Sequence, residues 1–367
     1  MVTYGHKSAP HGAAELIRTA IPAELGPVVD LAPVDAETPT WLVLADDGWI
    51  TRWECDTGAC TPLARLTQRP TTTGEPWDGH LPALRLHASR SGRYAAVVVD
   101  YGVEGEVFDL DAGKAVMALN GGSDDRETVP FSLAFAEHAG REVLIHRTEW
   151  NRLDVTDLAT GALLTPRSLA AAEPEEGTSE HYLDYFHGAL HLSPGGTRIA
   201  DDGWAWMPVG AVHAWELAPW LGGNVFESED GASAAWVCMR GYYWSHAMVW
   251  LDEHRLAVGG IGDDEEDIVP GARIFDLRLG TRDHYRHLKD AEVLAFTGPG
   301  DRFFSASQLL YAVAEAGLEV WDPDTGERLG GVPGFHPTRH HRGAGELVQL
   351  AGGDLLRWKI VDPRPTP

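Results

Sequence analysis

Histidine is the residue type in this chain best suited to acid–base or metal chemistry, and 17 of the 367 residues are histidines. His87 and His191 occupy matching places, each two residues before a serine that precedes a turn, and His246 and His340 lie near two further predicted strands. Converging imidazoles and carboxylates could hold a divalent ion or transfer protons. The spacing is nonlocal and shows no convergence, so we predict no metal, no cofactor and no catalytic residue.

Signatures of other chemistries are missing from the sequence. It contains no G-x-S-x-G nucleophile elbow, no H-E-x-x-H pair and no phosphate-binding Walker loop. The alternating carboxylates at 263–267 could face calcium, but Ile268 stands where a helix–loop–helix calcium site needs glycine. The sequence therefore offers no local motif for catalysis.

Aromatic and histidine side chains gather in segments that we predict to be long loops, at roughly 68–84, 169–188, 222–245 and 331–345. Long loops on a rigid scaffold are common places for binding residues. The candidate partner-binding residues are Trp77, His80, His181, Tyr182, Tyr185, His187, Tyr242, Tyr243, Trp244, His246, His336 and His340. The alternative interpretation is that these side chains plug a central channel and hold the loops in place.

Acidic pairs and runs are predicted in loops on the same face, namely Asp46-Asp47, Asp100, Asp201-Asp202 and 263–267. Aromatic anchors within a polar rim are typical of a protein-binding patch. An acidic rim would suit a basic partner, whereas the simpler interpretation is that these are solvated loops.

The overall charge narrows the class of partner. Acidic residues outnumber basic ones 55 to 29, for a formal net charge of −26, and such a surface repels nucleic acids and anionic membranes. The same charge favours a monomer.

Three cysteines are too few for a disulfide framework, so free thiols are expected. The first 22 residues lack the apolar core of a signal peptide, and no apolar run is long enough to cross a bilayer, which together predict a cytoplasmic protein.

A short pattern repeats along almost the whole chain: an aromatic residue, an acid, three residues and then glycine. It is clearest in FDLDAGKAV (108–116) and WDPDTGERL (321–329). Complete or degenerate copies begin at Trp53, Phe108, Thr156, Trp215, Phe275, Trp321 and Trp358. The aromatic residue would end a strand, the acid would bond turn amides, and glycine would supply the positive φ of a tight hairpin.

Two further strand-like runs precede each hairpin, for example ALHLSPGGTRIA (189–200). Four-stranded units at this spacing predict an all-β, seven-bladed β-propeller that forms a single domain over residues 1–367. Too few residues follow Trp358 for a final outer strand. We therefore expect residues 15–22 to form the outer strand of the last blade and to close the ring.

The chain resembles the WD40-repeat family, and more broadly WD40-like bacterial propellers with degenerate repeats. The resemblance rests on EVWDPDTGERL (319–329), GEVFDLDAGKAV (105–116) and the LSPGG turn at 192–196, and it extends weakly over nearly the full length. It implies a propeller that holds partners. The chain departs from the family in having one Trp-Asp pair, no Gly-His dipeptides at the repeat starts, and longer, irregular blades.

These observations favour a non-catalytic protein-binding or scaffold role for the long-loop face, with a protein or peptide as the partner. The alternative is an enzyme, such as a hydrolase, lyase or cyclase, with a histidine and carboxylate site at the mouth of the channel. A sensor of small molecules or peptides is a third reading that the sequence does not separate from the first. An enzyme would need an enclosed pocket with converging polar groups, whereas a scaffold needs a broad patch.

Overall fold

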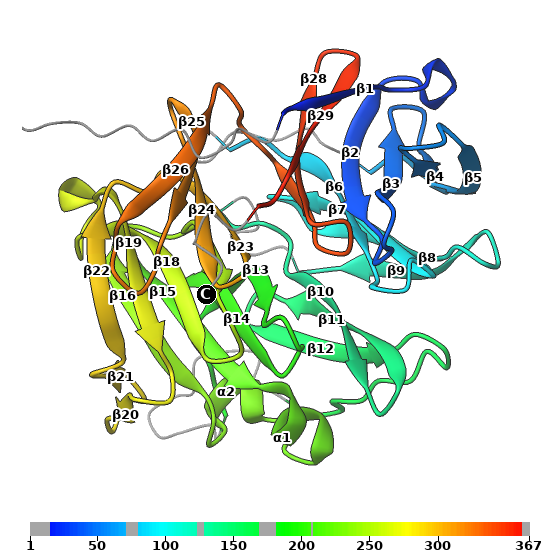
Figure 1. Ribbon diagram of the computed structural model, residues 1–367. Coiled ribbons are helices and arrows are strands. Elements are labelled where there is room, and N and C mark those ends of the chain that lie inside the picture. Colours follow the sequence, from blue (N-terminus) through cyan, green and yellow to red (C-terminus); the bar gives the residue numbers. More distant parts are fainter. Residues whose placement is uncertain (1–14, 71–79, 123–127, 169–180, 207, 362–367) are drawn as a thin grey trace, which may run out of the picture.

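Seven small antiparallel sheets surround a central axis in the computed structural model, which confirms the predicted propeller (Figure 1). The structure describes residues 15–70, 80–122, 128–168, 181–206 and 208–361. Within a blade, consecutive strands pair from the innermost to the outermost. One such sheet buries little surface alone, and neighbouring blades therefore have to pack face to face.

The strands of the first three blades follow the chain in order. The first blade comprises β2 (Val28–Pro33), β3 (Thr40–Ala45), β4 (Trp49–Glu54) and β5 (Cys60–Arg65), preceded by the 3-10 turn η1 (Ala23–Leu25). The second comprises β6 (Ala83–Ala88), β7 (Tyr94–Asp100), β8 (Glu104–Asp109) and β9 (Lys114–Asn120). The third comprises β10 (Leu133–His138), β11 (Arg141–Glu149) and β12 (Arg152–Asp157).

The fourth and fifth blades carry the insertions. The fourth comprises β13 (Phe186–Leu192), β14 (Arg198–Ala205), β15 (Val209–Glu216) and β16 (Ala235–Gly241), with α1 (Leu217–Gly222) and α2 (Glu227–Asp230) before its last strand. The fifth comprises β17 (Met248–Trp250), β18 (Arg255–Ile261), β19 (Val269–Asp276) and β22 (Glu292–Thr297). It also carries the 3-10 turn η3 (Glu265–Asp267) and the hairpin β20 (Thr281–Arg282) and β21 (Leu288–Lys289).

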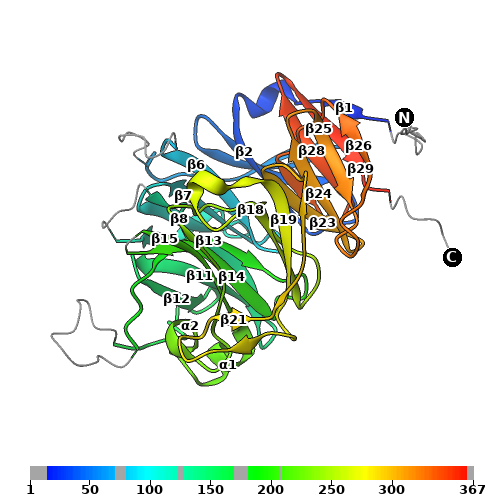
Figure 2. The same ribbon diagram turned by 90° about the vertical axis from the view of Figure 1, so that its left-hand side faces the viewer.

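The last two blades close the ring. The sixth comprises β23 (Arg302–Ala306), β24 (Leu309–Ala314), β25 (Gly317–Trp321) and β26 (Arg328–Pro333). The seventh comprises β27 (Arg339–His341), β28 (Glu346–Ala351), β29 (Asp354–Lys359) and β1 (Ile17–Ala20). The helices α1 and α2 lie on the opposite side of the ring from the seventh blade (Figures 1 and 2).

The N-terminal strand completes the last blade, as the sequence predicts. β1 pairs antiparallel with β29, with Ile17 opposite Arg357 and Ala20 opposite Asp354. In Figure 1 the dark blue β1 lies beside the red β29. The Ile21 amide extends the pairing by donating to the Gly353 carbonyl at 2.9 Å. The two ends of the chain are therefore joined within one sheet, which leaves no open edge on β29.

Four copies of the sequence pattern form the expected tight turns. Gly58, Gly113, Gly161 and Gly326 all have φ between 65° and 73°. The acid works as expected: the Asp157 carboxylate accepts the Ala159 and Thr160 amides at 3.0 and 2.9 Å. The local pattern thus determines the hairpin between the third and fourth strands.

Three blades depart from the predicted four-strand unit or its tight turn. In the described part of the third blade, only an isolated bridge between Thr156 and Leu163 stands in place of the outer strand. In the fourth blade, residues 217–234 with α1 and α2 replace the tight turn. In the fifth, Phe275-Asp276 leads into β20 and β21, and His287 bridges to Trp236 on the outer strand of blade four. The prediction of a tight turn was therefore wrong for the copy that begins at Phe275.

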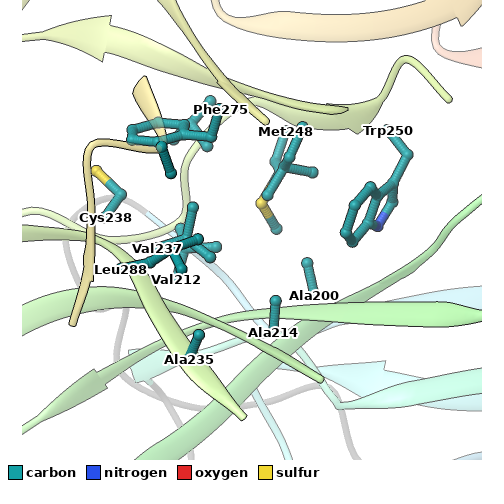
Figure 3. Close-up of a cluster of buried hydrophobic side chains, with 13 residues drawn as sticks. Ala200, Val212, Ala214, Ala235, Val237, Cys238, Met248, Trp250, Phe275 and Leu288 are labelled. Carbon is teal, nitrogen blue, oxygen red and sulfur yellow. The ribbon is translucent and has the colours of Figure 1, made fainter. Parts of the chain in front are cut away.

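The core lies between blades rather than at the centre of the molecule. Between the fourth and fifth blades, Met248 and Trp250 point toward the small side chains of Ala200 and Ala214, all fully buried (Figure 3). Large residues of one sheet thus fill the space above small residues of the next. Among the described residues, no helix is both long and apolar enough to cross a membrane.

Strand alternation divides the connections between two faces. The face here called the inter-blade face carries the connections from one blade to the next and the turns between second and third strands. The face here called the hairpin face carries the turns between first and second strands and those between third and fourth. Two of the predicted long loops are therefore corrected. The range 222–245 contains strand β16, and its residues before 235 lie on the hairpin face instead of the inter-blade face. The range 331–345 contains strand β27.

Candidate functional site

A stack of aromatic rings occupies the inter-blade face at the fourth blade. The Trp204 ring stacks on Phe186 at a centroid distance of 4.2 Å and on Trp244 at 5.3 Å. Trp206 lies 5.8 Å from Trp204, the middle ring of the stack, with the two rings tilted by 35°, and 62% of its surface is exposed. The indole N–H groups of Trp204 and Trp244 donate to the Thr128 hydroxyl and carbonyl, both at 2.9 Å. Hydrogen bonds to Thr128 therefore hold the stack in place, and Trp206 is the exposed ring beside it.

The predicted triplet Tyr242, Tyr243 and Trp244 divides between surface and interior. Tyr242 is 58% exposed, and its amide donates to the Pro208 carbonyl at 2.9 Å, two residues beyond Trp206. Tyr243 turns inward, with the Arg240 guanidinium 5.7 Å from its ring centre and His246 edge-on at 5.2 Å. Among the described residues of this surface, Tyr242 and Trp206 are therefore the exposed anchors. Trp206 was not among the sequence candidates, although the alternation Trp204, Trp206 at a strand end could have indicated it.

An acidic turn lies directly beside Tyr242. The Gly241 amide donates to the Asp263 carbonyl at 2.9 Å, and Gly241 bridges to Asp264. All five side chains from Asp263 to Asp267 are exposed. Asp263 pairs with Arg273 at 3.0 Å, and no ion pair to a described residue satisfies the other four. Trp206, Tyr242, Trp244 and Asp263–Asp267 are here called the aromatic–acidic patch.

Asp201 and Asp202 do not belong to an acidic rim, which corrects the expectation from sequence. Both lie within β14 and are at most 1% exposed. The Asp201 carboxylate lies 2.5 Å from His187 Nδ1, and the Asp202 carboxylate lies 2.6 Å from His246 Nδ1. Asp100, likewise, is buried and pairs with Arg85 at 2.9 Å. The carboxylates are paired because an isolated buried charge is very unfavourable.

The two His–Asp pairs are enclosed by protein. His187 and His246 are 1% and 6% exposed, and their Nε2 atoms are buried without a hydrogen-bond partner in the described part of the chain. The Asp201 carboxylate also accepts the Gly188 amide at 2.9 Å, yet burial raises its pKa. Tyr185 is fully buried beside it, and its hydroxyl donates to the Ala211 carbonyl at 2.8 Å. This arrangement ties strands together and presents no reactive atom to solvent.

The remaining candidates are dispersed. His80 stacks on Tyr101 at 4.6 Å, and His181 stacks on Phe226 at 3.8 Å and pairs with Asp230 of α2 at 2.8 Å. His336 faces the Glu315 carbonyl at 3.0 Å. Tyr182 is half-buried beside His181 in the chain, and Trp77 lies outside the described residues. The structure thus brings together Tyr242, Tyr243, Trp244 and His246, and it keeps His181 at α2.

Histidines line the central channel in a neutral form. Burial lowers the pKa of His87 to about 4 and that of His340 to about 3, with Arg85 and Arg342 adding to the respective effects. The Tyr101 hydroxyl, from the second blade, hydrogen-bonds to Ser245 in the connection before the fifth, and burial raises its pKa to about 12. No group of three metal-ligating side chains occurs within the described ranges. Cys55, Cys60 and Cys238 are free thiols.

A cavity of about 390 Å³ opens at the hairpin-face end of the channel. The turns between first and second strands of blades one, two, three, four and seven form its wall, with His340 of β27. Of the predicted site residues that the structure describes, His340 alone lines this cavity. Sequence reasoning missed its charged residues because they come from strand ends and turns that are far apart in the chain.

Comparison with known proteins supports the fold alone. No family model matches the sequence, and no curated protein matches it. A chain in the solved structure titled "Crystal Structure of Mitotic Checkpoint Complex" is similar over 99% of both chains, with a TM-score of 0.53 and 13% sequence identity. That likeness agrees with the propeller fold that the WD40 resemblance implies.

Proposed function

We propose that this propeller is a scaffold that holds a protein partner at the aromatic–acidic patch, and that the bound segment of the partner is basic. The observation that carries the proposal is the position of two exposed aromatic rings, Trp206 and Tyr242, beside carboxylates that have no counter-ion in the described chain. WD40-like propellers are commonly protein-binding scaffolds, and the solved chain of similar fold belongs to a complex.

The chemistry of the patch suits arginine in particular. A guanidinium stacks on an indole or phenol face through its planar π-system and forms two hydrogen bonds with a carboxylate. Trp206 and Tyr242 supply the faces, and Asp264 to Asp267 supply the carboxylates within the same patch. An arginine-bearing segment would therefore meet both requirements at once. An acidic segment would be repelled. A cytoplasmic location and a monomeric state remain predictions.

The test uses defined peptides with the purified chain. Fluorescence anisotropy would compare binding of arginine-rich peptides with that of glutamate-rich peptides of matched length. Trp206→Ala and Tyr242→Ala should each weaken arginine-peptide binding by about fivefold or more, because tryptophan and tyrosine are enriched among the interface residues whose loss costs over about 1 kcal/mol. Replacing Tyr243 would be a poor test, since its ring packs on Arg240 and His246 and its loss would disturb the fold.

The matched control is Tyr285→Ala. Tyr285 is 71% exposed but lies in the hairpin between β20 and β21 on the opposite face. The Tyr285→Ala variant should bind the arginine-rich peptide with unchanged affinity. Equal binding of the acidic and basic peptides, or equal loss in Tyr285→Ala, would contradict the proposed surface. Raising the salt concentration should weaken binding by screening the carboxylates.

A further inference from the structure

The cavity on the hairpin face takes no part in the proposed partner binding, and its volume of about 390 Å³ lies in the range of small-molecule sites. It lies on the face of the ring opposite the aromatic–acidic patch. Two acidic side chains line the cavity from the third blade, and a basic side chain lines it from the seventh. The placement of these charges indicates which class of ligand the cavity could bind.

Two glutamates form an acidic wall on the third blade. Glu137 on β10 and Glu142 on β11 are direct partners in the antiparallel register, so both side chains lie on one face of the sheet. Glu142 accepts a hydrogen bond from the Ser91 hydroxyl at 2.8 Å. Glu137 is exposed and makes no hydrogen bond or contact ion pair with any described residue, and Arg90 attracts it only at longer range. Like charges placed opposite each other are destabilising, and a bound cation would relieve that repulsion.

An arginine without a partner lies across the cavity. Arg342 follows β27 on the seventh blade, which blades one and two separate from the third. Its guanidinium makes no hydrogen bond or contact ion pair with a described residue, and the Glu253 carboxylate attracts it only at longer range. Desolvation within the cavity and the nearby Arg90 lower the pKa of Arg342. Arg90 itself is occupied, because its Nε donates to the Asp35 carboxylate at 2.6 Å. The Glu253 carboxylate is occupied too, by the Ser193 hydroxyl at 2.8 Å and by the Gly195 amide.

Apolar groups line the space around these charges. Phe135, Leu192 and Val34 all border the cavity. His340 also borders it, and its lowered pKa of about 3 keeps the imidazole uncharged at neutral pH. A ligand would therefore meet opposite charges from two sides and an apolar surface around its middle.

We propose that this cavity binds a small zwitterion with an apolar body, such as an apolar amino acid or a short peptide. Its ammonium group faces Glu137 and Glu142, and its carboxylate faces Arg342. The glutamate pair gains a cation in direct contact, and the guanidinium gains a bidentate acceptor. The site stands independently of the protein-binding proposal, since the two use opposite faces of the ring.

Isothermal titration calorimetry with L-leucine and L-leucyl-L-leucine tests the proposal and separates the free amino acid from the peptide. N-acetyl-L-leucine lacks the ammonium group, and L-leucinamide lacks the carboxylate. Each cap should weaken binding of the amino acid by about tenfold or more, because it removes a charged partner from hydrogen bonds within the cavity. In Arg342→Gln, L-leucine and L-leucinamide should bind equally. In Glu137→Gln, L-leucine and N-acetyl-L-leucine should approach equality.

Matched measurements separate ligand recognition from folding. The side chains of Arg342 and Glu137 have no contact partner in the described chain, so both variants should melt at nearly the same temperature as the parent chain. Tyr242→Ala should bind the zwitterion normally. The proposal is overturned if neither L-leucine nor its dipeptide binds at millimolar concentration. It is also overturned if the capped forms bind as tightly as the free ones, or if L-leucinamide alone binds.

Discussion

Replacing Gly203 by alanine tests how the backbone builds the His187–Asp201 pair. Gly203 lies on β14, where a Cβ atom would stand 1.9 Å from the Phe186 carbonyl oxygen on β13. The two strands change register between Phe186 and Ala189, and Gly188 in this bulge shows a matching close approach, 1.9 Å from the Asp202 carbonyl oxygen. The absence of two Cβ atoms therefore allows the strands to approach closely enough for His187 to reach Asp201.

The expected cost follows from that distance. Ordinary van der Waals contact of a Cβ begins at 3.4 Å, so the strands must separate by more than about 1 Å. Overpacking of this kind costs about 1–3 kcal/mol. Weakening the buried bonds to the Asp201 carboxylate adds about 1–3 kcal/mol for a partly unsatisfied charged group. Gly203→Ala should therefore lower the free energy of unfolding by about 3 kcal/mol or more.

Guanidinium unfolding followed by tryptophan fluorescence measures this loss. The matched control is Gly330→Ala in β26, where a Cβ atom would meet nothing within 4 Å. That variant should remain within about 0.5 kcal/mol of the parent chain. If Gly203→Ala unfolds at the same denaturant concentration as Gly330→Ala, the close approach does not hold the pair together and the reasoning fails.

Two further predictions concern the closure of the ring and the channel histidines. Deleting residues 1–22 removes the strand that pairs with β29, so the melting temperature should fall by several degrees. The control is Arg18→Ala, which removes only the exposed ion pair with Asp354 and should leave the melting temperature nearly unchanged. Lowering the pH from 6.5 to 5 should reduce the free energy of unfolding, because histidines that stay neutral in the native channel take up protons in the unfolded chain. Each such histidine should lower the free energy of unfolding by up to about 1.4 kcal/mol per pH unit. His87→Gln should make this decline shallower, as urea titrations at both pH values would show, and an unchanged slope would contradict the assignment of His87 as neutral.

The local sequence pattern was sufficient to predict the blades. An aromatic residue such as Trp321, followed by Asp322 and Gly326, encodes its own hairpin, because the acid bonds turn amides and the glycine adopts φ of 72° within a few residues. The pattern failed at Asp276 and Gly280, where β20 and β21 leave the blade to contact β16. A contact with another blade decides the path of that segment, and such a contact has no local signal.

The candidate site was predicted in part. Tyr242 is exposed on the expected face, and the carboxylates at 263–267 form the expected acidic turn beside it. Asp201 and Asp202 have the composition of a solvated loop. Their burial is tolerable only because His187, on the first strand of the fourth blade, and His246, in the connection to the fifth, pair with them.

The sequence by itself determined the number of blades and the strand that closes the ring, because hairpins depend on neighbouring residues and a missing final strand must be supplied from elsewhere. Only the tertiary structure decided which charges lie opposite each other. Glu137 and Arg342 are about 200 residues apart, yet the ring sets both on one cavity. Electrostatic contacts between blades depend on the circular arrangement of the whole chain, and no local pattern of residues encodes them.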